Sequence, residues 1–379
     1  QVAHLWGKPY FYKYKMIKRI LYTLLIMFPV LASAQINTDR VMAIGRNALY
    51  FEDYVLSIQY FNQVINAKPY LSDPYFYRGL AKINLDDFQG AESDCSEAIE
   101  RNPFVVSAYQ VRGLARIQQN NFAGAIEDYT KALEFDPENI GVWHNMALCR
   151  IRQEDYKGAK NDLDKLIAIS PRYTKAYLMR GEVDLKQKDT LAAEKDFGKA
   201  IEIDRYDADT WASRAILRLQ QQRYKDAEAD FDHAIRLSTR NSGVYINRAL
   251  ARYHQNNLRG AMSDYDIALD IDPNNFIGHY NRGLLRAQVG DDNRAIQDFN
   301  FVIEMEPDNM MAIFNRGLLL DQTGDYKGAI KDYSTVINEY PNFLLGYQYR
   351  AQARRKIGDV KGADADEFKV LKAQLDKQN

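Results

Sequence analysis

Two columns of charged residues are the strongest candidates for a chemical role in this 379-residue chain. An arginine recurs at a step of 34 residues with one gap, and an aspartate stands sixteen residues after each arginine. Arginine remains protonated in proteins, and its planar fork of donors fits a carboxylate in a bidentate pair. We therefore predict a scaffold ladder of Arg–Asp pairs between helices, with two independently solvated rows as the alternative. The members are Arg78, Arg112, Arg180, Arg214, Arg248, Arg282, Arg316 and Arg350, and Asp94, Asp128, Asp162, Asp196, Asp230, Asp264, Asp298, Asp332 and Asp366.

No other set of residues has a pattern typical of a catalytic or metal site. The histidines are scattered, and no two of them form a His-x₃-His pair. The two cysteines do not form a Cys-x₂-Cys pair. The sequence has no phosphate-binding glycine loop and no nucleophile elbow. Acidic pairs such as Glu127-Asp128 recur once per period, which marks them as architecture. We predict no enzyme activity, no metal, no cofactor and no small-molecule substrate, and we interpret Cys95 and Cys149 as buried thiols rather than a disulfide.

Composition and charge indicate a folded chain without affinity for nucleic acid. The 26 Tyr and 17 Phe are too many large side chains for a disordered protein. The formal net charge is −1, and residues 1–34 contain five basic residues and no acidic ones. The remainder therefore carries 45 basic against 51 acidic residues, a net charge of −6. This balance disfavours nucleic acid as a partner.

The N-terminal segment has the features of a secretory signal. Lys18 and Arg19 follow Met16, an apolar run covers residues 20–31, and Ala32-Ser33-Ala34 supplies small residues for cleavage. We expect residues 16–34 to be the signal peptide and residues 1–15 to be upstream translated sequence. An uncleaved membrane anchor is the alternative. The prediction is export through the secretory pathway to a periplasmic or secreted location.

Three further columns establish an internal period of 34 residues. Small residues alternate between Gly and Ala in a column that runs from Gly45 to Ala351. Counted from Thr38, the period gives ten repeats, which end at Lys377. The proline column contains Pro69, Pro103, Pro137, Pro171, Pro273, Pro307 and Pro341, with Arg205 and Thr239 in its two gaps. The alanine column contains Ala91, Ala125, Ala159, Ala193, Ala227, Ala261, Ala295, Ala329 and Ala363.

Each repeat is predicted to form two short helices. In the ninth repeat the first helix covers residues 310–323, and Gly324 ends it as a left-handed cap. Asp325 caps a second helix over residues 326–339, which Pro341 stops. Asn120 and Asn256 share the position of Gly324, because asparagine also tolerates positive φ. The aromatic residues four positions after the alanine column are predicted to be core: Phe61, Tyr129, Phe197, Phe231, Tyr265, Phe299 and Tyr333.

These columns resemble the tetratricopeptide repeat, whose length and Gly…Ala…aromatic…Pro pattern they share. The resemblance covers residues 38–377 and implies an all-α protein: a right-handed α-solenoid of ten tandem 34-residue helix-turn-helix repeats with a concave groove. We expect one domain with polar end repeats, since Glu367 and Ser57 replace an aromatic residue and an alanine in the last and first repeats.

The resemblance also implies which residues line the groove, namely positions 2, 5, 6, 9, 12 and 13 of each repeat. Position 6 is Asn145, Asn247, Asn281 and Asn315, and an amide offers a donor and an acceptor to the backbone of an extended peptide. Position 5 supplies Ile246, Tyr280 and Phe314, and position 2 supplies Ile277, Met311 and Leu345. The alternative is that these asparagines only satisfy neighbouring helix ends. The clamp that some such proteins use for acidic carboxy-terminal tails needs Lys at position 5 and Asn at position 9, and both are missing.

The sequence therefore predicts a non-enzymatic scaffold that binds a partner protein or peptide in its groove. The rival interpretations are a self-assembling structural protein and a regulatory subunit of a separate enzyme. A membrane protein complex that the chain contacts peripherally is one kind of partner that the sequence allows. The oligomeric state is left undetermined.

Overall fold

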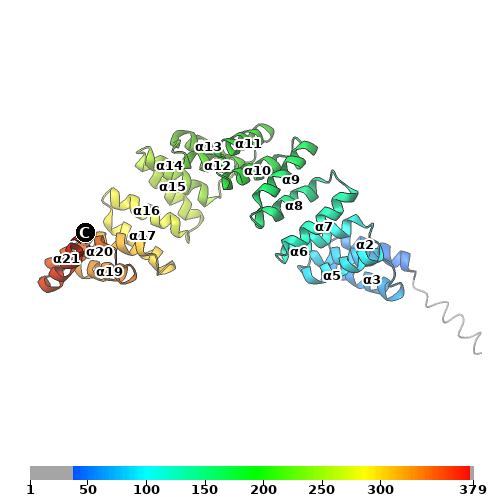
Figure 1. Cartoon of the computed structure of the whole chain (residues 1–379), viewed down its shortest axis with the longest axis horizontal. Helices are drawn as coiled ribbons and strands as arrows, with labels where there is room; N and C mark the ends of the chain where they lie inside the picture. The colour runs from blue at the N-terminus through cyan, green and yellow to red at the C-terminus, as the bar shows by residue number, and fades with distance from the viewer. Residues whose placement is uncertain (1–36, 376–379) are drawn as a thin grey trace, which may run out of the picture. The chain divides into compact units, whose positions relative to one another are not determined.

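The computed structural model describes residues 37–375, and the predicted leader, residues 1–34, lies outside this range. The described residues are all-helical and form an α-solenoid of tandem helix pairs, as the period predicted (Figure 1). Contacts divide the chain into two compact units, one ending at Ala176 and the other beginning at Tyr177. The 34-residue period runs through this boundary, which falls in the first turn of a helix.

The first unit contains the helices of repeats one to four. In each repeat the first helix packs against the second, and the second packs against the first helix of the next repeat. The helices are α2 (Thr38–Tyr50), α3 (Tyr54–Ala67), α4 (Asp73–Ile83), α5 (Phe88–Arg101), α6 (Val106–Gln118), α7 (Phe122–Phe135), α8 (Ile140–Arg152) and α9 (Tyr156–Ile169).

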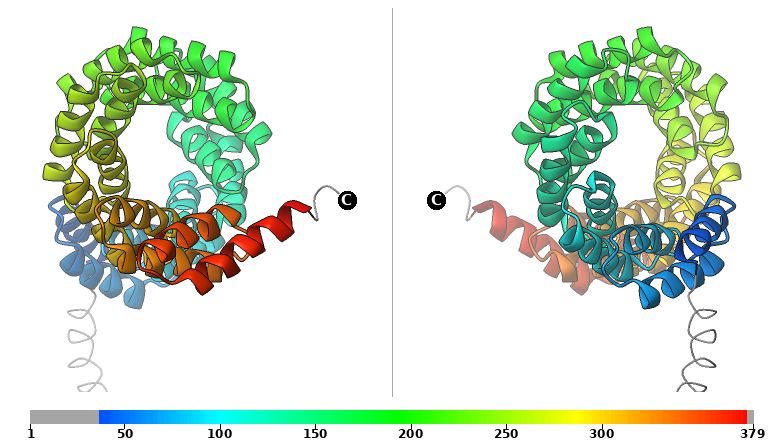
Figure 2. Two further views of the ribbon diagram at one scale, coloured as in Figure 1. Left: turned by 90° about the vertical axis from the view of Figure 1, so that its left-hand side faces the viewer. Right: turned by 90° about the vertical axis from the view of Figure 1, so that its right-hand side faces the viewer.

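The second unit contains repeats five to ten in the same arrangement, and α21 is its last helix (Figure 2). The helices are α10 (Thr174–Lys186, whose first turn belongs to the first unit), α11 (Thr190–Ile203), α12 (Ala208–Gln220), α13 (Tyr224–Leu237), α14 (Ser242–His254), α15 (Leu258–Ile271), α16 (Phe276–Gln288), α17 (Asp292–Met305), α18 (Met310–Gln322), α19 (Tyr326–Glu339), α20 (Leu344–Lys356) and α21 (Val360–Leu375).

The small and aromatic columns form the core within each repeat. Every alanine of the alanine column is completely buried, as are Phe197 and Phe231. A methyl group added to Gly181 would lie 2.5 Å from the ring of Phe197, and one added to Gly113 would lie 2.8 Å from Tyr129. The residues of the Gly/Ala column are small because an aromatic ring of the second helix packs directly on the backbone of the first helix. Burial raises the pKa of the Cys95 thiol to about 12, and both cysteines are buried and free, as predicted.

The turn between the two helices has one geometry in every repeat. Its left-handed residue is Gly324 in the ninth repeat, and Asp325 then accepts a hydrogen bond from the backbone N–H of Gly328 at 3.0 Å, as predicted. Asn120 and Asn256 also have positive φ, at 59° and 61°. The sequence did not indicate that side chains with no preference for this region would adopt it. These residues are Glu52, Glu154, Lys188 and Gln222, whereas Asp86, also at positive φ, is of a type that tolerates it.

The predicted ladder is confirmed in all eight repeats that carry the arginine. In each, Nε and Nη2 donate to the two carboxylate oxygens of the aspartate sixteen residues later, at 2.5–3.2 Å. The aspartates are buried, and the arginines keep 12–22% of their side-chain surface exposed. A second cation often joins the pair: Arg252, one helical turn after Arg248, donates to Asp264 at 2.8 Å.

The third nitrogen of the arginine ties neighbouring repeats together. Nη1 of Arg248 donates to Asp232 of the preceding repeat at 2.6 Å, and Nη1 of Arg282 donates to Asp266 at 2.9 Å. Arg78, Arg112, Arg316 and Arg350 make the same bond to Asn62, Ser96, Asn300 and Ser334. One side chain thus holds both the two helices of its own repeat and the repeat before it.

The fourth repeat breaks the ladder, because Met146 stands where the arginine would be. Its buried aspartate, Asp162, keeps one cation: Nε of Arg150 lies 2.8 Å away, without hydrogen-bond geometry. Burial therefore dominates and raises the pKa of Asp162 to about 6, although Arg150 opposes the shift. At Asp298, burial also pushes the pKa up, but hydrogen bonds from His279 and Arg282 outweigh it and lower the pKa.

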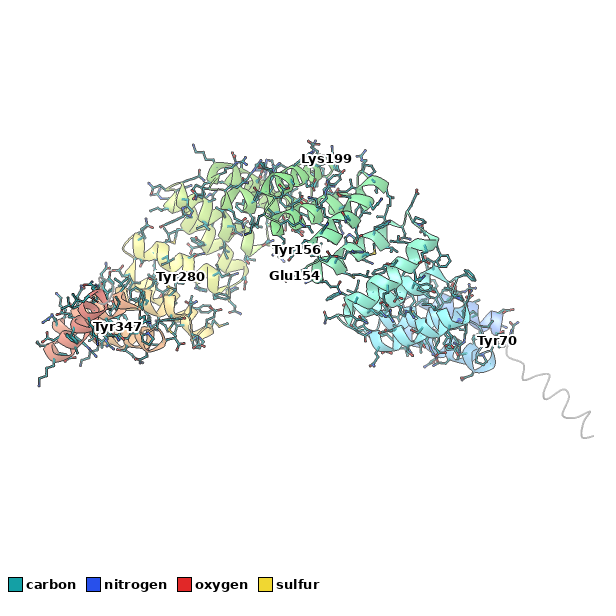
Figure 3. The ribbon with its side chains drawn as sticks, viewed as in Figure 1. Tyr70, Glu154, Tyr156, Lys199, Tyr280 and Tyr347 are labelled. Atoms are coloured by element: carbon teal, nitrogen blue, oxygen red, sulfur yellow. The ribbon has the colours of Figure 1, made fainter. Side chains whose placement is uncertain are left out.

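We predict that Glu154→Gly stabilises the protein, because Glu154 is exposed and holds φ at 60°, a region that costs a side chain about 1 kcal/mol (Figure 3). The matched control Gly324→Ala, at the same position of another repeat, should destabilise it by a similar amount. Urea denaturation measures both. If Glu154→Gly destabilised the protein, the turn at this repeat would not be strained.

We also predict that one substitution has opposite effects at two rungs of the ladder. Asp162→Asn should stabilise the protein by about 1–3 kcal/mol at neutral pH, since a carboxylate with a raised pKa costs stability once it ionises. The gain should vanish at about pH 4, where Asp162 is protonated in the folded state. Asp298→Asn should instead destabilise the protein at neutral pH, because Arg282 and Arg286 lose their anion.

Unfolding midpoints of both variants at about pH 7.5 and about pH 4 provide the measurement. A loss of stability for Asp162→Asn at neutral pH would contradict the prediction, and so would an unchanged Asp298→Asn.

Candidate functional site

The predicted groove residues lie on the first helices of the repeats, and most of them are in the second unit. Asn247, Asn281 and Asn315 are half-buried at the same position of α14, α16 and α18. Asn145 lies on α8 of the first unit, beside the hydroxyl of Tyr129. The structure therefore brings three of the four asparagines into consecutive repeats of one unit.

Two of these amides have unused hydrogen-bonding capacity. Within residues 37–375, the side chains of Asn247 and Asn281 make no hydrogen bond. Asn315 differs, because its amide donates to the hydroxyl of Tyr280 at 3.1 Å (Figure 3). Burial raises the pKa of Tyr280, and the bond from Asn315 works against that shift. These asparagines do not cap helices, since the caps of α14, α16 and α18 are Asn241, Asn275 and Asn309.

The apolar residues at position 2 are exposed, as a binding surface requires. Met311 is 61% exposed, Ile277 is 50% exposed and Leu345 is 43% exposed, in three consecutive repeats. Leu284, at position 9 of the eighth repeat on α16, is also exposed. Position 9 is one of the positions that the resemblance assigns to the groove, but Leu284 was not among the residues predicted to bind. Together with Asn247, Asn281 and Asn315, these four residues form what we call the first-helix surface.

The expectation that Ile246 and Phe314 offer groove surface needs correction. Ile246 is 7% exposed and packs with Tyr245 and Tyr265, and Phe314 is 8% exposed and lies against the rings of Tyr333 and Phe343. The physical reason is the helical rotation of about 100° per residue. Position 5 lies about 60° from the buried small column at position 8, so a large side chain there turns into the core. Position 2 lies about 60° further around the helix, about 120° from position 8, and remains in solvent.

Neither a metal-binding cluster nor a membrane-spanning helix occurs among the described residues. Residues 37–375 contain no group of three or more His, Cys, Asp or Glu side chains placed to hold a metal ion. No helix in that range combines the length and apolarity needed to span a bilayer. The partly buried histidine His279 is used structurally: one ring nitrogen contacts Asp298 at 3.0 Å and the other contacts the carbonyl oxygen of Pro273 at 3.0 Å.

Comparisons with known proteins agree with this architecture. Two family models described as "Tetratricopeptide repeat" match the chain. One matches residues 140–173 and 174–207, and the other matches residues 213–276 and 280–342. A third model, described as "TPR repeat", matches residues 113–149. No curated protein sequence matches the chain significantly.

Two solved structures show the same fold at low sequence identity. A tetratricopeptide repeat protein from Parabacteroides merdae is 21% identical, with a TM-score of 0.51, and the match covers 66% of this chain and 98% of that one. The C-terminal part of a TPR repeat-containing protein from Cytophaga hutchinsonii is 17% identical, with a TM-score of 0.52, and the match covers 62% of this chain and 97% of that one.

Proposed function

Because this chain belongs to the tetratricopeptide repeat family, we propose that it is a non-enzymatic scaffold that binds an extended stretch of a partner polypeptide on the first-helix surface. The observation that carries the proposal is the pair Asn247 and Asn281, whose amides are half-buried and make no hydrogen bond to any residue in the described range. Neither amide is among the fully buried side-chain groups without a partner in the described range, so both remain accessible to a ligand. A peptide backbone would supply a carbonyl for each NH₂ group and an N–H for each amide oxygen.

The surroundings of the amides favour a polypeptide over a small polar ligand. Ile277, Met311, Leu345 and Leu284 expose apolar surface beside them. Methionine is flexible and polarisable, so it adapts to side chains of different shapes. Backbone contacts to the amides with apolar contacts around them give affinity for an extended chain and modest selection for its side chains.

We predict that the triple substitution Asn247→Ala, Asn281→Ala, Asn315→Ala weakens peptide binding by about tenfold or more, since each lost hydrogen bond costs about 1 kcal/mol. A library of immobilised extended peptides identifies ligands of residues 35–379, and titration of the best one gives affinities. The matched control removes three exposed amides elsewhere in the second unit, at Asn274, Asn338 and Asn342. Circular dichroism checks that both triple variants are folded. If they then bind the peptide with equal affinity, the first-helix surface is not the binding site.

A second candidate function, self-assembly of the solenoid through its ends, is favoured by the exposure of the terminal repeats. Polar end repeats were expected, yet Phe368, Leu371 and Leu375 are more than half exposed on α21. In the first repeat Tyr50 and Phe51 are 81% and 76% exposed. An apolar surface on a terminal repeat is what stacking on another copy would cover.

If the ends stack, sedimentation velocity should detect a concentration-dependent oligomer of the wild type that Phe368→Glu and Leu371→Glu abolish. Leu191→Glu serves as the control, because Leu191 is equally apolar and exposed but lies in the fifth repeat. A monomer at all concentrations, or an oligomer that survives the α21 substitutions, would exclude this mode of assembly.

A further inference from the structure

The second unit contains a cavity of about 600 Å³ outside the first-helix surface. It is lined by α11, by the turn that precedes α12, and by α12 and α13. Gly198 on α11 and Arg214 on α12 face it from two neighbouring repeats. Trp211 and His233 stack with ring centroids 4.2 Å apart and supply a flat aromatic part of its wall.

This cavity occurs where, within the described residues, one bond between repeats is missing. In six other rungs of the ladder, Nη1 of the arginine donates to an oxygen of the residue sixteen positions earlier, as Arg248 does to Asp232. For Arg214 that residue is Gly198, which has no side chain. Nε and Nη2 of Arg214 hold Asp230 at 2.8 Å, and Nη1 makes no hydrogen bond to any residue from 37 to 375. The space is open, because a methyl group added to Gly198 would meet no atom within 4 Å.

Two more cations line the cavity. Arg205 occupies a gap of the proline column, so the departure from the repeat pattern adds a positive charge at this point. The guanidinium groups of Arg205 and Arg236 form no ion pair or hydrogen bond within the described part of the chain. Glu202, an acidic residue of the lining, is paired with Lys199 of α11 at 2.9 Å. Among the described residues, the cavity therefore has an unpaired donor and an excess of positive charge.

We propose that this cavity binds a carboxylate from an acidic segment of a polypeptide. The chain itself indicates the ligand chemistry, because the next two repeats satisfy the same Nη1 with carboxylates, at 2.6 Å from Asp232 and 2.9 Å from Asp266. An incoming Asp or Glu side chain supplies to Arg214 the oxygen that Gly198 lacks. Arg205 and Arg236 attract further acidic residues beside the first. This site is independent of the first-helix surface and does not require that surface to bind a peptide.

The test uses Gly198→Asp, which places the carboxylate of the neighbouring repeats into the cavity. A capped peptide of six glutamates and its glutamine counterpart are titrated against residues 35–379 by fluorescence anisotropy at low salt. We expect the glutamate peptide to bind and the glutamine peptide not to bind, and Gly198→Asp to weaken binding by about tenfold or more. Because the introduced carboxylate would pair with Arg214, the melting temperature of this variant should not fall, which separates loss of the site from loss of the fold.

Two further variants locate the binding. Arg236→Gln should also weaken it, whereas Arg259→Gln, the same charge change at an exposed arginine of α15, should leave it within about twofold of wild type. The triple asparagine variant of the first-helix surface should bind the glutamate peptide like wild type. The proposal is overturned if the glutamate peptide does not bind, or if Gly198→Asp binds it as tightly as wild type. Inorganic phosphate that displaces the peptide at an equal concentration of anionic groups would overturn the choice of a carboxylate in favour of a phosphoryl ligand.

Discussion

The buried Arg–Asp pair is the interaction on which the rest of this solenoid depends. Each aspartate is removed from water on the second helix, and such a charge is tolerated only with a well-placed countercharge. The bidentate fork of the arginine meets that need, and it also fixes how far the second helix slides and rotates against the first. In the eight repeats that carry it, the pair holds the small column opposite the aromatic column, and close packing of Gly45 on Phe61 keeps the same register in the first repeat, which lacks the pair.

The departures from the ladder carry as much information as its regularity. At Met146 one cation is missing, and a buried carboxylate is left with an unusually high pKa. At Gly198 one acceptor is missing, and a cation is left facing an open cavity. A missing cation raises the pKa of the carboxylate, so below about pH 6 protonation removes the uncompensated charge without any other molecule. A missing acceptor cannot be absorbed in this way, because arginine keeps its proton, so the missing oxygen must come from water or from another molecule.

The sequence was most informative where one column of residues determines one contact. The period, the helix bounds and the Arg–Asp pairs follow from such columns, and the positions of Gly324 and Asp325 predicted a complete turn. Where several side chains could fill the same place in the core, burial predicted from the sequence was less reliable. Ile246 and Phe314 were assigned to the groove by position, but the rotation of the helix carries them into the core. Glu154 and Lys188 adopt positive φ although neither type favours it, because the helices on both sides impose the turn.

Two other features could not be predicted from residue types. The division of contacts between Ala176 and Tyr177 has no counterpart in the period, which continues unchanged across it. The exposed apolar residues of α21 sit among lysines and glutamines, so composition alone suggested a polar face. Both depend on which side chains pack against which neighbours, and a single sequence without a structure does not fix this.

The bond from six of the ladder arginines to the preceding repeat also bears on how the protein unfolds. In a linear array, where each repeat touches only its neighbours, cooperativity depends on the strength of coupling at every interface. Strong coupling between two repeats makes them unfold together, and weak coupling lets them unfold separately. At the interface between α11 and α12, where Gly198 leaves Nη1 of Arg214 without this bond, Glu194 of α11 instead accepts hydrogen bonds from Arg218 at 3.0 Å and from Arg223 at 2.8 Å. Unfolding that spreads from α21 therefore has to break the ion pairs of Glu194 at this interface, and not a bond of the ladder.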